Sequence, residues 1–257
     1  MRCLIGFFGL TRSLRHTAGS IHNAFYEPLL RAGIPVLSAG HFNLPDIIDN
    51  PRSGEFGITP DRTESSLLNL DLCWIESQAR INVETPVAVG RAFPDGFGDG
   101  YRSLENLVQQ LRSLERLWTM LQLFGVAGDD LLLLLRPDLF YFDRLDPIRD
   151  LRPILDGNAD LIVPGWQGWG GLNDRFAFCN RRGAQAYATR LVAFLDGCLA
   201  MGGMHSERFL QFVAQRQGLR VAHTGLRAAR VRANGQIARN DAGLLASQWQ
   251  AQPAAAA

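Results

Sequence analysis

The segment Asp129-Asp-Leu-Leu-Leu-Leu-Leu-Arg-Pro-Asp138 contains five consecutive leucines between charged residues. Five residues cannot span a membrane, and a short apolar run with polar ends is typical of a strand that is covered on both faces. Pro137 has no amide hydrogen to donate to a sheet, so the strand should end before it. We therefore expect a buried strand that brings Arg136 and Asp138 to one edge of a sheet.

Other apolar runs lie on both sides of this segment. Cys3 to Gly9 is apolar and β-prone, and Arg12 and Arg15 follow where a signal peptide would continue with apolar residues or be cleaved. We interpret it as a first buried strand and expect no transmembrane segment. Further strands are predicted at 35–38, 161–163, 176–178, 219–222 and 229–232.

Apolar residues at helical spacing alternate with these strands. The pattern is longest over 103–124, with Ser103 as a candidate N-cap and Gly125 at the end. The segment 42–61 is crowded with Pro, Gly, Asn and Asp, which predicts a long surface excursion. Other helices are predicted at 21–30, about 65–80, 184–199 and 206–217.

This alternation predicts an α/β fold with a mainly parallel central sheet flanked by helices. The 257 residues, of which 47% are hydrophobic, are enough for one large domain, which we expect over 1–245. The alanine-rich tail 246–257 has no apolar face and is expected to be frayed or disordered.

The charge composition limits the partners of the protein. The formal net charge is +1, which argues against nucleic acid or an anionic membrane as a partner recognised by bulk charge. All 26 basic residues are arginine, so Schiff-base chemistry and phosphate binding by lysine are excluded. Any recognition of an anion must therefore rely on arginines and backbone amides.

Ligands of open α/β sheets bind beyond the carboxyl ends of the strands, so the loops after Gly9, Leu135 and Val163 should share one edge. The first of these loops holds Gly9, Thr11 and Arg12, a combination suited to a nucleotide. The alternative interpretation is an ordinary solvated loop.

The second loop contains Arg136 and Asp138. A carboxylate at a strand end can hold Mn²⁺ or Mg²⁺, and the cation and the arginine together would neutralise a diphosphate. His223 is a candidate to complete a metal shell. A structural Arg–Asp pair that caps the strand is the alternative.

The third loop, Gly165-Trp-Gln-Gly-Trp-Gly-Gly-Leu-Asn-Asp174, combines two tryptophans with four glycines. The faces of Trp166 and Trp169 suit sugar rings, and Asn173 and Asp174 suit sugar hydroxyls. The alternative is that the tryptophans plug the sheet edge while Asp174 pairs with Arg175.

His205-Ser-Glu207 precedes a predicted helix. Glu207 is either a capping acid in the first turn or a group that binds or deprotonates an acceptor hydroxyl, and His205 lies beside it. Asp174 competes for the same role. No Gly-x-Ser-x-Gly elbow supports a serine hydrolase, and no Gly-x-Gly-x-x-Gly follows the first strand.

Taken in order, five segments resemble bacterial and viral GT-A-type glycosyltransferases of surface-polysaccharide synthesis, such as those of capsule and O-antigen. The resemblance spans nearly the whole chain. The segments are Gly-Phe-Phe-Gly-Leu-Thr-Arg-Ser-Leu14, Leu-Arg-Pro-Asp-Leu139, Asn-Asp-Arg-Phe-Ala177, His-Ser-Glu-Arg-Phe-Leu210 and Val-Arg-Ala-Asn-Gly235.

The resemblance implies a Rossmann-like GT-A domain that transfers a hexose or deoxyhexose from a nucleotide diphosphate sugar to a glycan or lipid-linked glycan. It also implies a cytoplasmic enzyme, or one held at the inner membrane through its acceptor. Gly9 and Arg12 map to the nucleotide, Arg136 and Asp138 to the diphosphate and metal, and Asp174 and Glu207 to the acceptor.

Arg136 stands where the family has the first acid of its DXD motif, which weakens the expectation of a metal. Asp174 is the first candidate for the base of an inverting transfer, and Glu207 is the second. A retaining transfer would need no such base. Two alternatives are a nucleotide-sugar-binding protein without catalysis and a sugar-phosphate nucleotidyltransferase.

Overall fold

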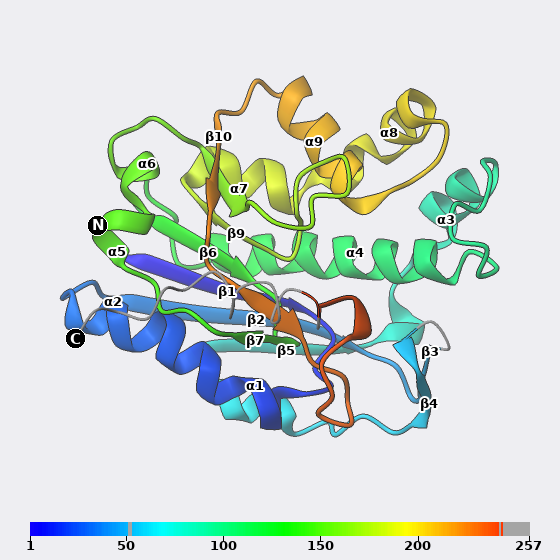
Figure 1. Cartoon of the computed structure of the whole chain (residues 1–257), viewed down its shortest axis with the longest axis horizontal. Helices are drawn as coiled ribbons and strands as arrows, with labels where there is room; N and C mark the ends of the chain where they lie inside the picture. The colour runs from blue at the N-terminus through cyan, green and yellow to red at the C-terminus, as the bar shows by residue number, and fades with distance from the viewer. Residues whose placement is uncertain (51–52, 242, 244–257) are drawn as a thin grey trace.

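The computed structural model of the chain describes residues 1–50, 53–241 and 243. Its main sheet contains β1 (Cys3–Gly9), β2 (Val36–Leu44), β5 (Leu72–Ser77), β6 (Leu131–Leu135), β8 (Leu161–Pro164), β9 (Phe176–Cys179) and β10 (Val221–Thr224). The strand order is β10-β8-β9-β6-β1-β2-β5 (Figure 1). Neighbouring strands run parallel, except that β9 is antiparallel to both β6 and β8. The expected α/β fold with a mainly parallel sheet is therefore confirmed, and the expected frayed tail lies outside the described residues.

The five leucines form β6, which lies between β1 and β9, and all five are buried. Leu132 and Leu134 pack into the core beneath α4 (Arg102–Gln122), whereas the other three pack into the core on the opposite side, with α1 (Leu14–Ile21). The run is apolar throughout because neither face of this strand meets water.

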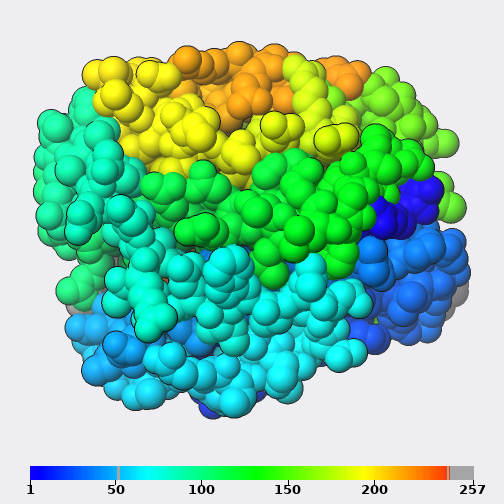
Figure 2. All heavy atoms as spheres, turned by 180° about the vertical axis from the view of Figure 1, so that it is seen from behind, coloured from blue at the N-terminus to red at the C-terminus, as the bar shows by residue number. Residues whose placement is uncertain are grey.

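Helices cover both faces of the sheet (Figure 1). Seen from behind, residues around 60–80 lie below the green residues around 110–150, and residues around 190–220 lie above them (Figure 2). Within the described residues, none of the helices combines the length and the hydrophobicity that a membrane crossing requires. On one face, α4 shares its core with four other helices: α3 (Glu84–Arg91), α7 (Arg181–Ala188), α8 (Phe194–Met201) and α9 (Ser206–Arg216). On the other face, η1 (His22–Tyr26), α2 (Glu27–Arg31) and α6 (Arg152–Leu155) pack into the same core as α1, and α5 (Pro147–Asp150) contacts α6.

Two small antiparallel sheets lie outside the main sheet. One pairs β7 (Leu139–Tyr141) with β11 (Ala228–Arg230). The other pairs β3 (Ile48–Asn50) with β4 (Glu55–Ile58). The first holds Arg230 beside the end of β6, and the second forms a hairpin within the segment that was expected to be a surface excursion.

The structure corrects several predicted elements. The helix predicted at about 65–80 is wrong: this segment forms the 3-10 helix η3 (Glu64–Leu68), the edge strand β5 and the 3-10 helix η4 (Gln78–Arg80), because residues 72–77 pair with β2. The helix predicted at 184–199 is divided by the 3-10 helix η5 (Arg190–Ala193). The strand predicted at 229–232 joins β7 and not the main sheet.

The first helix begins at residue 14 and not near 21. Leu14, Thr17 and Ile21 lie on its buried face. The carboxylate of Glu64 accepts a hydrogen bond from the backbone amide of Leu14 at 3.2 Å. The carboxylate of Glu64 therefore accepts one of the free amides of the first turn of α1, and such amides can otherwise bind phosphate.

The close packing of α7 against the start of β8 can be tested by substitution of Gly183. A Cβ atom there would lie 1.8 Å from the backbone oxygen of Asp160, so Gly183→Ala should lower the free energy of unfolding by about 1–3 kcal/mol. Gly19→Ala in α1 is the matched control, because its Cβ meets open space, and it should raise stability by about 0.5–1 kcal/mol. Equal effects of the two changes in urea denaturation would contradict this packing.

Candidate functional site

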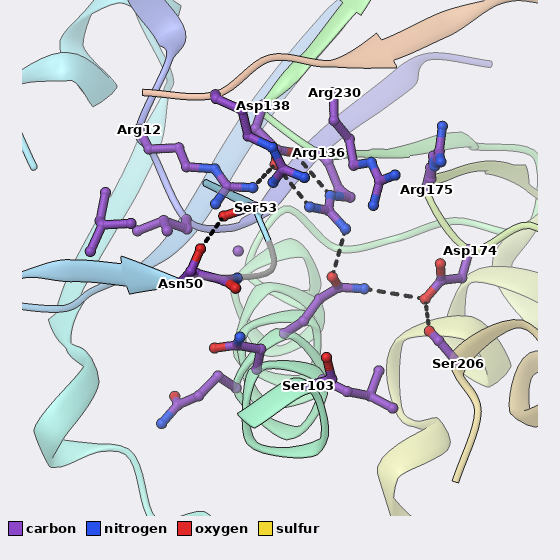
Figure 3. A pocket seen from close by; sticks show the side chains of 18 of the residues that line it. Arg12, Asn50, Ser53, Ser103, Arg136, Asp138, Asp174, Arg175, Ser206 and Arg230 are labelled. Atoms are coloured by element: carbon purple, nitrogen blue, oxygen red, sulfur yellow. Dashed lines mark hydrogen bonds and ion pairs between the residues drawn. The ribbon is translucent and has the colours of Figure 1, made fainter. Parts of the chain in front are cut away.

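A pocket of about 810 Å³ opens at the carboxyl ends of β1 and β6 (Figure 3). The loops after these two strands and the loop before β9 all line it, as the shared-edge argument predicted. The hairpin β3–β4 and the first half of α4 close its other sides. Six arginines line the pocket: Arg12, Arg136, Arg175, Arg230, Arg232 and Arg239.

The first group of charges surrounds Asp138, which is 2% exposed. Its Oδ1 accepts a hydrogen bond from Nε of Arg136 at 2.9 Å, and its Oδ2 accepts from Nη2 of Arg136 at 2.9 Å and from Nη2 of Arg12 at 2.8 Å. Burial opposes ionisation of this carboxyl, but the two guanidiniums outweigh it and hold its pKa well below the usual range. Asp138 is therefore a fixed anion that orients both arginines.

Glu55 extends this group to the β3–β4 hairpin. Its Oε2 accepts a hydrogen bond from Nη1 of Arg12 at 2.9 Å, and its Oε1 accepts from the backbone amide of Ala233 at 3.0 Å. Arg232 approaches the same carboxylate at 3.7 Å. Burial and the nearby Arg12 and Arg230 lower the pKa of Arg232 to about 10, which shows how closely positive charges are crowded here.

The second group surrounds Asp241, which is completely buried. Arg175 donates to its carboxylate from Nη2 at 2.8 Å, and Arg230 donates from Nη2 and Nε, both at 3.0 Å. One carboxylate thus faces two arginines. Burial, followed by repulsion from Arg230, lowers the pKa of Arg175 to about 10.

Two further acids, Asp174 and Glu207, line the same pocket. The carboxylate of Asp174 accepts a hydrogen bond from Ser206, accepts another from Nε2 of Gln110 at 3.3 Å, and lies 3.5 Å from Nη2 of the buried Arg190. Glu207 lies 3.3 Å from Nδ1 of His205. Burial, and then the negative charge of Asp174, raise the pKa of Glu207 to about 7.

Gln110 on α4 connects the two parts of the pocket. Its Oε1 accepts from Nη1 of Arg136 at 2.9 Å, while its Nε2 donates to Asp174 (Figure 3). A neutral amide thus joins the Asp138 group to the pair of acids. Either end of the pocket is held in position relative to the other by this side chain.

The structure brings together most of the side chains selected from sequence. Gly9, Arg12, Arg136, Asp138, Trp169, Asp174, His205 and Glu207 all line the pocket. Gly9 has a φ of +102°, which suits glycine, and its amide donates to Oγ of Ser113 at 2.8 Å. The alternative of an ordinary solvated loop after β1 is not supported, because Arg12 is built into the Asp138 group.

Four selected residues do not line the pocket. Thr11 is 1% exposed, and Asn173 is buried, with its Nδ2 donating to the carbonyl of Trp166 at 2.7 Å. The indole of Trp166 donates to the carbonyl of Leu226 at 2.9 Å and packs under Arg175, so the interpretation as a plug holds for this tryptophan. His223 lies on the outer strand β10.

The expected metal ligands do not come together. Both oxygens of Asp138 accept hydrogen bonds from arginines, and His223 does not line the pocket. Over the described part of the chain, no group of three or more His, Cys, Asp or Glu side chains is placed to hold a metal ion. The residues around Asp138 therefore do not fit a Mn²⁺ or Mg²⁺ site.

Sequence reasoning missed Glu55, Gln110, Arg190 and the second group of arginines. Arg230 and Arg232 stand two positions apart near the end of the chain, a spacing that puts both on one face of an extended segment, and this was a usable signal. Arg175 was read only as the partner of Asp174. Its partner is Asp241, 66 residues later in the chain.

The two acids should respond differently to amide substitution. Arg190 is completely buried, so Asp174→Asn leaves its charge without its carboxylate partner and should lower the free energy of unfolding by about 3–5 kcal/mol. Chemical denaturation at pH 7 measures this loss. A change below about 1 kcal/mol would mean that Arg190 does not depend on Asp174.

Glu207→Gln should change the pH dependence of stability. The pKa of Glu207 is raised from 4.5 to about 7 in the folded state, so its contribution to stability is fully present below about pH 4.5 and is lost as the pH rises through 7. The glutamine stays neutral, so the variant should be the more stable protein at pH 8 and close to wild type at pH 4.5. A difference that does not vary with pH would contradict the raised pKa.

Comparisons with known proteins give structural neighbours only. No protein-family model matches the chain, and no similar curated protein was found. The apo structure of mouse xyloside xylosyltransferase 1 is 13% identical, with a TM-score of 0.41 over 87% of this chain and 84% of that one. A glycosyltransferase involved in glycosylation of the major capsid of PBCV-1 is 10% identical, with a TM-score of 0.41 over 87% of this chain and 82% of that one.

Proposed function

We propose that the protein is a glycosyltransferase that moves a hexose or deoxyhexose from a nucleoside diphosphate sugar to a hydroxyl of a glycan or lipid-linked glycan. The observation that carries this proposal is the pair Arg12 and Arg136, which Asp138 orients in a pocket that Asp174 and Glu207 also line. The negative charge of a diphosphate complements these two guanidiniums, and we propose that one of the two acids takes the proton of an acceptor hydroxyl. The motif resemblance supports a role in surface-polysaccharide synthesis in the cytoplasm.

The arginines support donor binding without a metal. Arg136 and Arg12 are oriented by Asp138, and each guanidinium carries further N–H groups that suit phosphate oxygens. Two fixed cations at this corner would stabilise the negative charge that develops on a diphosphate leaving group. Gly9 permits close approach of the backbone to the nucleotide.

Glu207 is the better supported base of the two acids. A general base works best when its pKa lies near the operating pH, and the pKa of Glu207 is about 7. The carboxylate of Asp174 is already engaged by Ser206, Gln110 and Arg190. We therefore propose Glu207 as the proton acceptor of an inverting transfer, with Asp174 as the fixed negative charge beside it, which reverses the order expected from sequence.

The acceptor would approach over Trp169 and His205. Trp169 lines the pocket and is 57% exposed, so its ring is free to stack on a sugar. His205 contacts Glu207 and stacks on Phe97 with ring centroids 5.9 Å apart. These side chains place an aromatic surface next to the proposed base.

Binding of nucleoside diphosphates should depend on Arg136 and not on a divalent cation. Arg136→Ala should weaken binding of the tightest ligand among UDP, GDP, CDP and dTDP by about thirtyfold, on the order of 2 kcal/mol, because a charged partner is lost. Arg152→Ala, an exposed arginine of α6 outside the pocket, is the control. Calorimetry with EDTA and with added Mn²⁺ should give the same affinity for the wild type, and a strong dependence on Mn²⁺ would contradict the arginine site.

Turnover should depend on Glu207. Glu207→Gln should preserve donor binding and lower single-turnover transfer by about a hundredfold or more, the usual contribution of a general base. The product should have inverted anomeric configuration. Near-normal turnover or retained configuration would remove the base role, and donor binding without transfer to any acceptor would favour a binding protein.

A further inference from the structure

The second group of arginines has binding capacity that the fold does not use. Arg175 is 4% exposed and lines the pocket, yet its buried Nη1 has no hydrogen-bond partner among the described residues. A buried donor without a partner costs about 1–3 kcal/mol, so such a group in a pocket wall is available to bind a polar group of a ligand. Arg239 lines the same pocket, is exposed, and forms no ion pair within the described part of the chain.

The guanidinium of Arg175 is held rigidly. Nη2 is fixed by Asp241, and the guanidinium lies 5.0 Å from the ring centroid of Trp166. Asp241 also binds Arg230, so a single carboxylate faces two guanidiniums, and Arg239, two residues before Asp241 in the chain, lines the same pocket. This group therefore carries an excess of positive charge in a fixed geometry, which suits an oxyanion.

This group is separate from the one around Asp138. It is built on a different buried carboxylate and comes from the start of β9, from β11 and from the segment that follows β11. In Figure 3, Arg175 and Arg230 lie on the side of Asp174, whereas Arg12 lies at the other end of the row, with Arg136 between. The positive charges of Arg175 and Arg230 also act on Glu207: they lower its pKa, against the larger effects of burial and Asp174, which raise it.

We propose that Arg175, Arg230 and Arg239 form a second anion subsite, which binds a carboxylate or phosphate carried by one of the sugars at the point of transfer. The inference rests on the proposed function and makes it more specific: besides the diphosphate, one of the two substrates is acidic. The acidic group would be either the carboxylate of a uronic acid in the donor or a carboxylate or phosphate on the acceptor.

A neutral sugar would not compensate the positive charge of this group of arginines. Its hydroxyls would satisfy one N–H but would leave the excess of buried positive charge without compensation. A carboxylate or a phosphate presents two oxygens to a guanidinium and can engage the unpartnered Nη1. Neutral polar side chains that suit sugar hydroxyls also line the pocket, among them Ser103, Asn106 and Gln109 on α4 and Asn240 next to Arg239 in the chain.

The test compares acidic and neutral probes by calorimetry on the full-length protein. The donor arm uses UDP-glucuronate against UDP-glucose and GDP-mannuronate against GDP-mannose. The acceptor arm uses glucuronate and glucose 6-phosphate against glucose, with and without saturating nucleoside diphosphate. The wild type should prefer the acidic member by about tenfold or more in one arm, and that arm identifies which substrate carries the anion.

Two variants test whether the preference for the acidic probe depends on this subsite. Arg239→Ala, at an exposed position, and Arg175→Lys, which keeps the charge but loses the planar fork, should each lower the preference about fivefold or more. Binding of the plain nucleoside diphosphate should change by less than about twofold in both variants. Arg152→Ala is again the control and should change neither quantity.

Equal binding of acidic and neutral probes in both arms would overturn the subsite. A loss of plain diphosphate binding in Arg239→Ala and Arg175→Lys as large as the loss of preference would overturn it too, because these arginines would then belong to the donor diphosphate. If no nucleotide binds but glucuronate or glucose 6-phosphate still binds more tightly than glucose, the proposed donor is wrong and the anion subsite stands.

Discussion

The carboxylate of Asp138, buried at the end of the central strand, accepts hydrogen bonds from Arg136 and Arg12, and the geometry of the pocket depends on this contact. It joins the end of β6 to the loop after β1. Through Arg12 it also reaches Glu55 and thereby the β3–β4 hairpin. Burying one anion among arginines is stable only when the hydrogen bonds are well formed, and here both carboxylate oxygens are engaged. The arginines are thus oriented in advance, which reduces what a phosphate ligand must reorganise.

The two acids at the other end of the pocket, Asp174 and Glu207, have unequal environments. Gln110 accepts a hydrogen bond from Arg136 and donates one to Asp174. The carboxylate of Asp174 also accepts a hydrogen bond from Ser206 and pairs with the buried Arg190. Among the described residues, no arginine forms an ion pair with Glu207, and burial together with the negative charge of Asp174 raises its pKa. Two carboxyl groups in one pocket therefore have different chemistry because their neighbours differ, not because their residue types do.

Much of the central fold could be predicted from sequence because the central strands carry their own signal. The five-leucine run fixed β6, and the shared edge of parallel strands then placed Gly9, Arg12 and Arg136 together. The edge strand β5 was mistaken for a helix, because its apolar run Leu72–Ile75 is too short for periodicity to distinguish a strand from a helix and none of its residues is buried. Arg175 and its partner Asp241 could not be predicted, because nothing local signals a contact across 66 residues. A metal was expected at Asp138, with His223 as a possible further ligand, without knowledge that Arg12 would reach the carboxylate.

The central claim is that guanidiniums oriented by Asp138 bind the diphosphate of a nucleotide. A crystal structure of the protein grown with its tightest nucleoside diphosphate in the presence of EDTA tests this claim most directly. We expect phosphate oxygens within about 3 Å of the guanidiniums of Arg136 or Arg12, with Asp138 still bound to both arginines. Phosphates placed elsewhere in the pocket, or Asp138 released from its arginines, would contradict the account.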